Sequence, residues 1–548
     1  MNAPSAARRL GAVLAILLST LGLLMPPVAE ADSAAVGDLH VAQTLGGREL
    51  TVILRRVTGV PGPLHVDVIT HKGTAAGRLD LAVVPTGVST SASAASVSGT
   101  TVDTAAVALS GRPGTCSAVL DVTRAGPWEL SLSDGNRTAT IPFIVPKQLT
   151  SPPETAVYLG FSGAGVLLLV TLLVAVRARR GWWTLVPGGA LVACLAVAVT
   201  GALLSSRLPP PPSQGGQVDA TIDGVDDPYA YSGQRIGDYS RPPGTLLLSS
   251  STTRAGEVAD VRLALSDAST GLPLDDVVVH DGALLHLLVV GPSGQLWHLH
   301  PIRTGAGVFE VPLSLPEGGH YAVSAEFARR GGGVQQLRSA TGIDAVPATG
   351  RTTTGSRPEV AARTTAGDLQ VGAGARTVAD VQVRLSASSL VAGQAAVLSA
   401  RVGDTATLQP WLGMLGHLIV VGPLAPEAAV GTATQNAQVW AHSHSMGAMP
   451  DRTHDTSGTD GTAHAPGMGP HSPSPGLDPD MPGMGGLTSV NGDSTADETV
   501  AAYGPDICFV HTFPAPGYYR IWIQAERGYT VLTVPYLLHV TGTVEKRP

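Results

Sequence analysis

The chain has 548 residues, enough for about three or four domains, and a net charge of −8. Charged residues make up 14% and aromatic residues 4%, while Gly, Pro, Ala, Val and Thr abound, so we expect a mainly β protein of short strands and turns. Because phosphates demand a positive face, the negative charge and the lack of a large basic cluster argue against nucleic acid as a partner.

Residues 1–31 are predicted to be a signal peptide. Arg8 and Arg9 precede an apolar run over 10–25, and Ala29-Glu30-Ala31 fits a cleavage site. The segment from 32 to 150 then shows about eight alternating stretches separated by Gly, Pro and Ser turns, which predicts an extracytoplasmic immunoglobulin-like β-sandwich. Its three histidines are interpreted as strand histidines rather than ligands.

Two uncharged stretches, 155–176 and 184–204, are long enough to be transmembrane helices. The loop between them, 177–183, carries Arg177, Arg179 and Arg180 beside Trp182 and Trp183, which predicts that it is cytoplasmic. The hairpin returns the chain to its starting side, so the N-terminal and C-terminal domains are both expected outside the cytoplasmic membrane. Few ionisable residues lie in these helices, which favours an anchor over an ion path.

A Pro-rich spacer covers 205–243, and two copies of one domain plan follow. The run Leu285-His286-Leu287-Leu288-Val289-Val290-Gly291-Pro292 matches Gly416-His417-Leu418-Ile419-Val420-Val421-Gly422-Pro423, and Pro316, Gly319 and Tyr321 match Pro514, Gly517 and Tyr519. We therefore expect repeat 1 over 244–346, a linker over 349–368 and repeat 2 over 369–548, each another immunoglobulin-like sandwich. Repeat 2 carries an insertion, 445–503, too polar and too rich in Gly and Pro to fold alone.

Each repeat contains a His-x-His motif, Trp297-His298-Leu299-His300 in the first and Trp440-Ala441-His442-Ser443-His444 in the second. Residues i and i+2 of a strand point to one face, roughly 7 Å apart, so each motif aims two imidazoles at one place. If 291–295 forms a five-residue hairpin turn, His286 lies opposite His300, but a register shifted by one moves it to the other face. The sequence leaves this register open.

These motifs predict two separate metal sites, one in each repeat. The first would use His286, His298 and His300, and the second His417, His442 and His444. The alternative is that these histidines are structural and hydrogen-bonded within their sandwiches.

The insertion adds soft ligands. Thioether sulfur suits Cu(I), imidazole suits Cu(II), Zn(II) and Ni(II), and methionines in an unfolded segment have no core to fill. The candidate ligands are Met446, Met449, His454, His464, Met468, His471, Met481 and Met484. A low-complexity spacer without selected chemistry is the alternative.

The repeats resemble the YtkA-like and CopC-like extracytoplasmic β-sandwich families, through His286, Trp297-His298-Leu299-His300-Pro301 and their second copies. The His and Met-x-x-Met insertion is similar to the metal-binding tracts of periplasmic copper-resistance proteins. This resemblance implies copper handling outside the cytoplasmic membrane. The chain departs from it at the mature end, Asp32-Ser33-Ala34, where a copper-binding histidine is common in those families.

The expected function is therefore copper buffering, delivery or resistance by a membrane-anchored protein, with zinc as a second candidate ion and other envelope metal-handling proteins as partners. An envelope interaction or sensing module is the alternative. We do not expect an enzyme, because the sequence lacks a nucleophile elbow, a P-loop, a dinucleotide fingerprint and a His-Glu-x-x-His motif. Cys116 and Cys508 are left open as a bridge or as two free thiols.

Overall fold

The computed structural model describes residues 38–86, 103–145, 152–205, 242–347, 369–445 and 498–542, apart from positions 56, 58, 179, 250, 251, 331, 332 and 426–428. Contacts between residues divide the chain into two compact units, one with the long helices and one with all the strands. Each unit is described by itself. The predicted signal peptide, the linker 349–368 and all but the ends of the spacer and the insertion lie outside the described residues.

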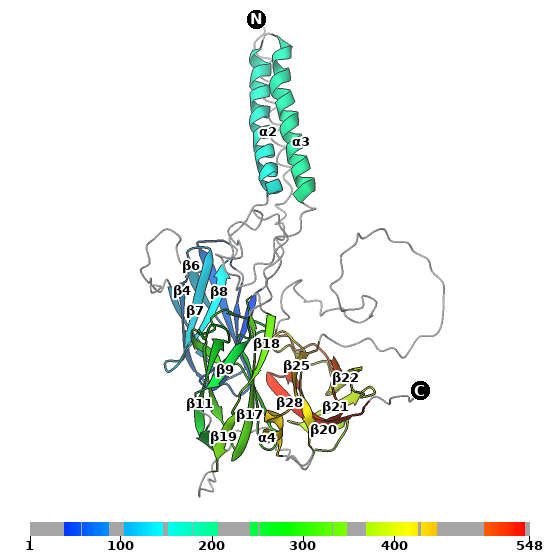
Figure 1. The fold of residues 1–548 in the computed structure, drawn as a ribbon. Coiled ribbons are helices and arrows are strands. Elements are labelled where there is room, and N and C mark those ends of the chain that lie inside the picture. The colour runs from blue at the N-terminus through cyan, green and yellow to red at the C-terminus, as the bar shows by residue number, and fades with distance from the viewer. Residues whose placement is uncertain are drawn as a thin grey trace, which may run out of the picture. The chain divides into compact units, whose positions relative to one another are not determined.

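The helical unit is a pair of long apolar helices, α2 (Pro152–Arg177) and α3 (Leu185–Ser205), joined through the short 3₁₀ helix η1 (Gly181–Thr184) (Figure 1). Both helical stretches are long and apolar enough to cross a membrane. Small residues let the helices approach: a Cβ added to Gly160 would lie 2.8 Å from the Cβ of Ala198, and one added to Gly201 would lie 2.9 Å from the carbonyl oxygen of Pro153.

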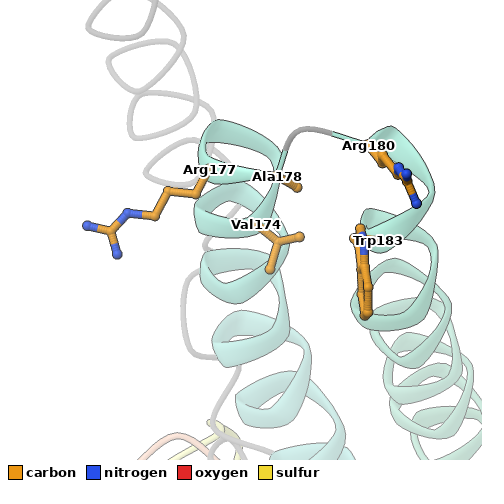
Figure 2. Close-up of a pocket in the computed structure, with 5 residues that line it drawn as sticks. All are labelled: Val174, Arg177, Ala178, Arg180 and Trp183. Atoms are coloured by element: carbon orange, nitrogen blue, oxygen red, sulfur yellow. The ribbon is translucent and has the colours of Figure 1, made fainter.

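The end of the hairpin that carries η1 holds aromatic and cationic residues. The rings of Trp182 and Trp183 stack with their centroids 4.4 Å apart. Figure 2 shows Val174 of α2 turned toward Trp183, whereas Arg177 extends away from α3. Indole and guanidinium groups are the side chains that favour the boundary between hydrocarbon and water.

The first β region, 38–145, consists of antiparallel strands in two sheets, ordered β1-β2-β3-β6 and β5-β4-β7-β8. Alternation determines the buried faces: on β3 Leu64, Val66 and Val68 are buried while His65 is exposed. Residues of both sheets share one core around the buried Trp128. The strands are β1 (Leu39–Leu45), β2 (Arg48–Leu54), β3 (Gly62–Thr70), β4 (Gly77–Pro85), β5 (Asp103–Leu109), β6 (Gly114–Val122), β7 (Gly126–Ser133) and β8 (Thr138–Val145).

The second β region, 242–347, has one sheet ordered β15-β16-β11-β9 and a larger one ordered β10-β19-β17-β13-β14, in which β12 and β18 also pair with β17. The hydroxyl of Tyr321 donates to the carbonyl oxygen of Glu317 at 2.8 Å and fixes the start of β17. The strands are β9 (Gly244–Leu248), β10 (Thr252–Arg254), β11 (Val258–Asp267), β12 (Val277–Val278), β13 (His286–Val290), β14 (Leu296–Leu299), β15 (Ile302–Gly305), β16 (Val308–Ser314), β17 (Gly319–Arg329), β18 (Gly333–Arg338) and β19 (Ile343–Val346).

The third β region, 369–445 and 498–542, has sheets ordered β20-β21-β22-β26 and β23-β27-β24-β25, with β28 also paired to β27. The hydroxyl of Tyr519 donates to the carbonyl oxygen of Ala515 at 2.9 Å, as that of Tyr321 does in the second region. The elements are β20 (Gly374–Val378), β21 (Val381–Ala387), β22 (Ala395–Val402), β23 (Leu408–Gln409), β24 (His417–Leu424), α4 (Val430–Gln435), β25 (Val439–His444), β26 (Asp506–Thr512), β27 (Gly517–Arg527) and β28 (Thr530–Val540).

The second and third β regions meet along a buried apolar layer, which we call the seam. It combines residues of both regions: Leu288, Val290, Leu296, Ala322, Ile419, Val421, Leu424, Val430, Ala437, Trp440 and Trp522. The indole N–H of Trp522 donates to the carbonyl oxygen of Gly294 at 3.1 Å, and α4 packs on β17. A Cβ at Gly431 of α4 would lie 1.8 Å from the carbonyl oxygen of His320, so only glycine fits there. The seam is therefore a packed interior, and the central strands β13, β17, β24 and β27 are buried on both faces along most of their length.

The cysteines are free in the described part of the chain. Cys508 is buried and Cys116 is partly exposed. Of the two alternatives left open by the sequence, the structure has the free thiols.

Candidate metal centre

The two hairpins that carry the His-x-His motifs have the same register. Leu287 pairs with Leu299 and Leu288 with His298, so the register places His286 opposite His300. In the third region His417 pairs with His444, and Ile419 pairs with His442. Residues 291–295 form the connection between β13 and β14, which is the five-residue case that the sequence left open. Both hairpins thus place three histidines on one face.

That face is the one at the seam, and it brings both sets of histidines together. The rings of His298 and His442 lie 4.9 Å apart between centroids, those of His298 and His417 5.7 Å, and those of His286 and His442 5.2 Å. The two sets that the sequence predicted as separate sites therefore lie side by side at the seam and form one continuous group. We call this group the histidine cluster: His286, His298, His300, His417, His442 and His444.

Hydrogen bonds orient the rings contributed by the second region. Nε2 of His286 donates to the carbonyl oxygen of His280 at 3.0 Å, since a carbonyl only accepts, and Nδ1 of His286 is left with a lone pair. Nδ1 of His298 donates to Oε1 of Gln524 at 2.9 Å, and the amide of Gln524 is itself oriented by Thr533. The two nitrogens without hydrogen, His286 Nδ1 and His298 Nε2, lie 3.1 Å apart.

The third region repeats this pattern with different acceptors. Nε2 of His417 donates to the carbonyl oxygen of Trp411 at 3.1 Å, and Nδ1 of His442 donates to Oε1 of Glu326 at 3.3 Å. Nδ1 of His417 and Nε2 of His442 are then without hydrogen and 3.2 Å apart. The orienting residues are exchanged across the seam, because Gln524 belongs to the third region and Glu326 to the second.

The two outer histidines also face acceptors. Nδ1 of His300 donates to Glu49 of the first β region, and Nδ1 of His444 lies 3.2 Å from Oδ2 of Asp281. The Nε2 atoms of both rings are buried and have no hydrogen-bond partner among the described residues. In metal-ligating histidines, one ring N–H usually donates to an oxygen, and the other ring nitrogen carries no hydrogen and has a free lone pair.

Burial favours the neutral form of several histidines in this cluster. It lowers the pKa of His286, His298 and His417 well below 6.5, and the nearby charges of other histidines lower these pKa values further. Burial likewise lowers the pKa of His444 to about 4. Because His286 and His298 are neutral, their facing lone pairs repel each other at a separation of 3.1 Å. A cation bound between the nitrogens turns that repulsion into two coordinate bonds.

The spacing fits a small ion. One ligand atom from each of His286, His298 and His442 lies within 4.8 Å of the others, and so does one from each of His417, His442 and His444. Nitrogens about 2.0 Å from a tetrahedral ion are roughly 3.3 Å apart. The pairs at 3.1 and 3.2 Å already have this separation, so only the third imidazole must move inward.

A rim of two acidic residues and a further histidine borders the cluster. His280, Asp281 and Glu326 form a further group whose ligand atoms lie within 4.8 Å of one another. Burial raises the pKa of Asp281, but the hydrogen bond with His280 and the charges of His444, His280 and His442 lower it, and the net effect places it below the usual value. The rim therefore holds an ionised carboxylate beside the third region's histidines.

The candidate ligands of the insertion lie outside the described residues: Met446, Met449, His454, His464, Met468, His471, Met481 and Met484. The orienting residues Glu49, Asp281, Glu326 and Gln524 were missed by the sequence analysis. A signal for two of them exists, since the alignment of Tyr321 with Tyr519, continued for five residues, matches Glu326 with Gln524 in two mostly apolar strands.

Another buried histidine, His71, lies in a different environment. Nδ1 of His71 lies 2.6 Å from Oε1 of Glu526, and Nε2 lies 3.2 Å from the hydroxyl of Thr51. Burial lowers the pKa of His71, but the hydrogen bond and the charges of Glu526, Glu498 and Glu49 raise it to about 9. Burial raises the pKa of Glu498 to about 7. We call His71, Glu498 and Glu526 the carboxylate cluster, which joins the first and third β regions.

Comparisons with known proteins identify no family. No family model matches the chain, and no curated protein matches it. Among solved structures, the Lin-41 filamin domain aligns over 20% of this chain and 100% of its own, at 16% identity and a TM-score of 0.15.

Two further similarities cover more of the chain. A putative membrane anchored protein from Corynebacterium diphtheriae aligns over 90% of this chain and 92% of its own, at 8% identity and a TM-score of 0.14. Invasin, a bacterial integrin-binding protein, aligns over 90% of this chain and 60% of its own, at 9% identity and a TM-score of 0.13. At such identities and TM-scores the similarities carry no function, so the function must be argued from the histidine cluster.

Proposed function

We propose that the chain is a membrane-anchored, extracytoplasmic metal-binding protein that buffers or delivers copper, with zinc as a second ion. In this proposal three immunoglobulin-like sandwiches, two of them copies of one unit, are held at the membrane by the α2–α3 hairpin. The observation that supports it most is the pairing of bare nitrogens, His286 Nδ1 with His298 Nε2 and His417 Nδ1 with His442 Nε2, each pair about as far apart as two ligands of one ion.

The choice of copper rests on ligand chemistry. Imidazole suits Cu(II), Cu(I) and Zn(II), whereas Ca²⁺ and Mg²⁺ require oxygen ligands, and the inner positions of the cluster offer nitrogen alone. The methionines between 446 and 484 extend the proposal on sequence alone, since thioethers select Cu(I). Capture by that segment and transfer to the cluster is the expected route.

A binding experiment on the full chain in detergent tests this function. Cu(II), Cu(I) under reducing conditions and Zn(II) are added in turn, the protein is dialysed, and the retained metal is measured by elemental analysis. We expect retained metal in the wild type and its loss in the double variant His298→Ala, His442→Ala, because these two central rings contact both halves of the cluster.

His65→Ala is the matched control, since His65 is exposed on β3 and is neither a member of the cluster nor one of its acceptors, and this variant should retain as much metal as the wild type. Equal retention in the double variant and the wild type, or no retained metal in either, would contradict the proposal. The remaining interpretation would then be an envelope interaction module with structural histidines.

A further inference from the structure

The histidine cluster is extended rather than spherical. At one end the ring of His300 contacts those of His286 and His298, with centroids 5.1 and 5.0 Å apart. In the middle His298 contacts His442 at 4.9 Å. At the other end the ring of His444 lies 4.8 Å from that of His417 and 4.5 Å from that of His442. A row of this kind offers two neighbouring binding positions rather than one centre.

The ring nitrogens that carry no hydrogen also form two groups, one in each β region. His286 and His298 form one close pair and His417 and His442 the other, each from a single β region. The second pair has His444 beside it, with a ligand atom within 4.8 Å of the pair, whereas the first pair has the ring of His300 in contact and the ligand atom of His442 within 4.8 Å. Nε2 of His300 and Nε2 of His444 are buried without a partner among the described residues. We call the group with His286, His298 and His300 the first half-site and the group with His417, His442 and His444 the second half-site.

The half-sites differ in the charge that orients them. In the first, His286 and His298 donate to the uncharged carbonyl of His280 and the amide of Gln524, and only the outer His300 faces a carboxylate, that of Glu49. In the second, His442 donates to the carboxylate of Glu326, and His444 lies beside that of Asp281. A carboxylate acceptor raises the basicity of the imidazole more than an amide does.

Two strands show that this difference is not forced by the fold. Glu326 pairs with His286 on β17, and Gln524 pairs with His417 on β27, so the two residues occupy matching places. In the turn before β24, Leu412 has φ 56°, close to the φ of 48° at Asp281 in the turn before β13. The matching turn therefore forms with an uncharged residue.

We infer that the cluster holds two metal ions side by side, one in each half-site, and that the second half-site binds a divalent cation first. This inference rests on the proposed function and goes beyond it, because it gives the centre a stoichiometry and an order of filling. His298 and His442, which contact each other and both halves, make the two ions neighbours.

Titration of the full chain in detergent with Cu(II), followed by electron paramagnetic resonance, tests the inference. The first equivalent should give an isolated Cu(II) signal with nitrogen splitting. The second equivalent should convert it to a spin-coupled signal, and two ions per chain should survive dialysis.

The order of filling is tested by Glu326→Gln, which makes the acceptor match Gln524, and by Asp281→Asn, which keeps the side-chain shape at a positive φ that asparagine also tolerates. Each variant should lower the affinity for the first ion by roughly 10 to 100-fold and should still bind two ions at saturation. Asp80→Asn, in an exposed ion pair with Arg78, is the control and should change neither.

One retained ion with an isolated signal in excess Cu(II) would overturn the inference and leave the proposed function in place. Unchanged affinity of the first ion in both carboxylate variants would overturn the order of filling. No retained Cu(II) or Zn(II) in the wild type would remove the proposed function and the inference together.

Discussion

The two buried clusters of the β unit use histidine in opposite ways. In the histidine cluster, burial and neighbouring imidazoles lower the pKa of His286, His298 and His417 well below 6.5. In the carboxylate cluster, Glu526 raises the pKa of His71 to about 9 in spite of its burial. The first environment leaves lone pairs for a ligand, and the second holds a proton in an ion pair. Burial alone therefore does not indicate whether a histidine is neutral or protonated. The groups that contact it, imidazoles in one cluster and carboxylates in the other, determine its charge.

The largest effect is expected from breaking the ion pair with His71→Ala. This variant leaves Glu526 buried without its cation, and such a loss costs about 3–5 kcal/mol. Thermal unfolding of the full chain, followed by circular dichroism of the strands, should show a clearly lower midpoint, while retained metal at a temperature below that midpoint should equal the wild-type value. Equal midpoints for His71→Ala and the control His65→Ala would show that His71 stabilises nothing.

The pH dependence should sharpen the comparison. Glu498 has its pKa raised from 4.5 to about 7, so its contribution to stability is full below pH 4.5 and is lost as the pH rises through 7. The pKa of His71 is raised from 6.5 to about 9, so its contribution is full below pH 6.5 and is lost as the pH rises through 9. Together they predict a fall in the free energy of unfolding between about pH 5 and 9.

Glu498→Gln separates the two contributions. It removes the buried carboxylate. The free energy of unfolding of the variant minus that of the wild type should therefore be roughly 3 kcal/mol larger at pH 8 than at pH 4. Unfolding midpoints measured across this range provide the check. A wild-type to variant difference that stays constant with pH would contradict the raised pKa of Glu498.

The smallest expected effect concerns the orientation of one ligand. Gln524→Ala removes the acceptor of the Nδ1 hydrogen of His298, and loss of such a partner weakens metal binding by roughly 10 to 100-fold. Competition with a chelator of known affinity measures this change. Gln382→Ala, at an exposed position of β21, is the control, and a similar loss of affinity in both variants would show that Gln524 has no orienting role.

The sequence predicted the local parts of this site well. Period-two alternation predicted the strand at β3. For the hairpin the sequence left two registers open, and the structure has the one with a five-residue turn, which places His286 opposite His300. The turn residues Pro316, Gly319 and Tyr321 marked the start of β17. Each of these features depends on residues that are close along the chain, so pattern and spacing either predict the feature or narrow it to two alternatives.

The meeting of the two hairpins was not predictable in the same way. The strand His286–Val290 is buried along its whole length. An uninterrupted apolar run predicts a strand that is covered on both faces, but it does not indicate which residues cover it. The residues that cover it, Ile419, Trp440 and Trp522 of the seam, lie more than a hundred residues away in the sequence. Contacts such as Gln524 with His298 follow from that packing and have no signal in local spacing.

The seam has a kinetic consequence for any ion in the histidine cluster. His286, His300 and His417 have no exposed surface, and the layer beside them is sealed by Trp522 hydrogen-bonded to Gly294 and by the close fit of Gly431 on His320. An ion held by these three histidines leaves only when packed apolar surfaces separate, a collective motion of the microsecond to second range. Residence time would then be governed by the opening rate of the interface and not by the number of ligands, so a partner that loosens the seam would control release.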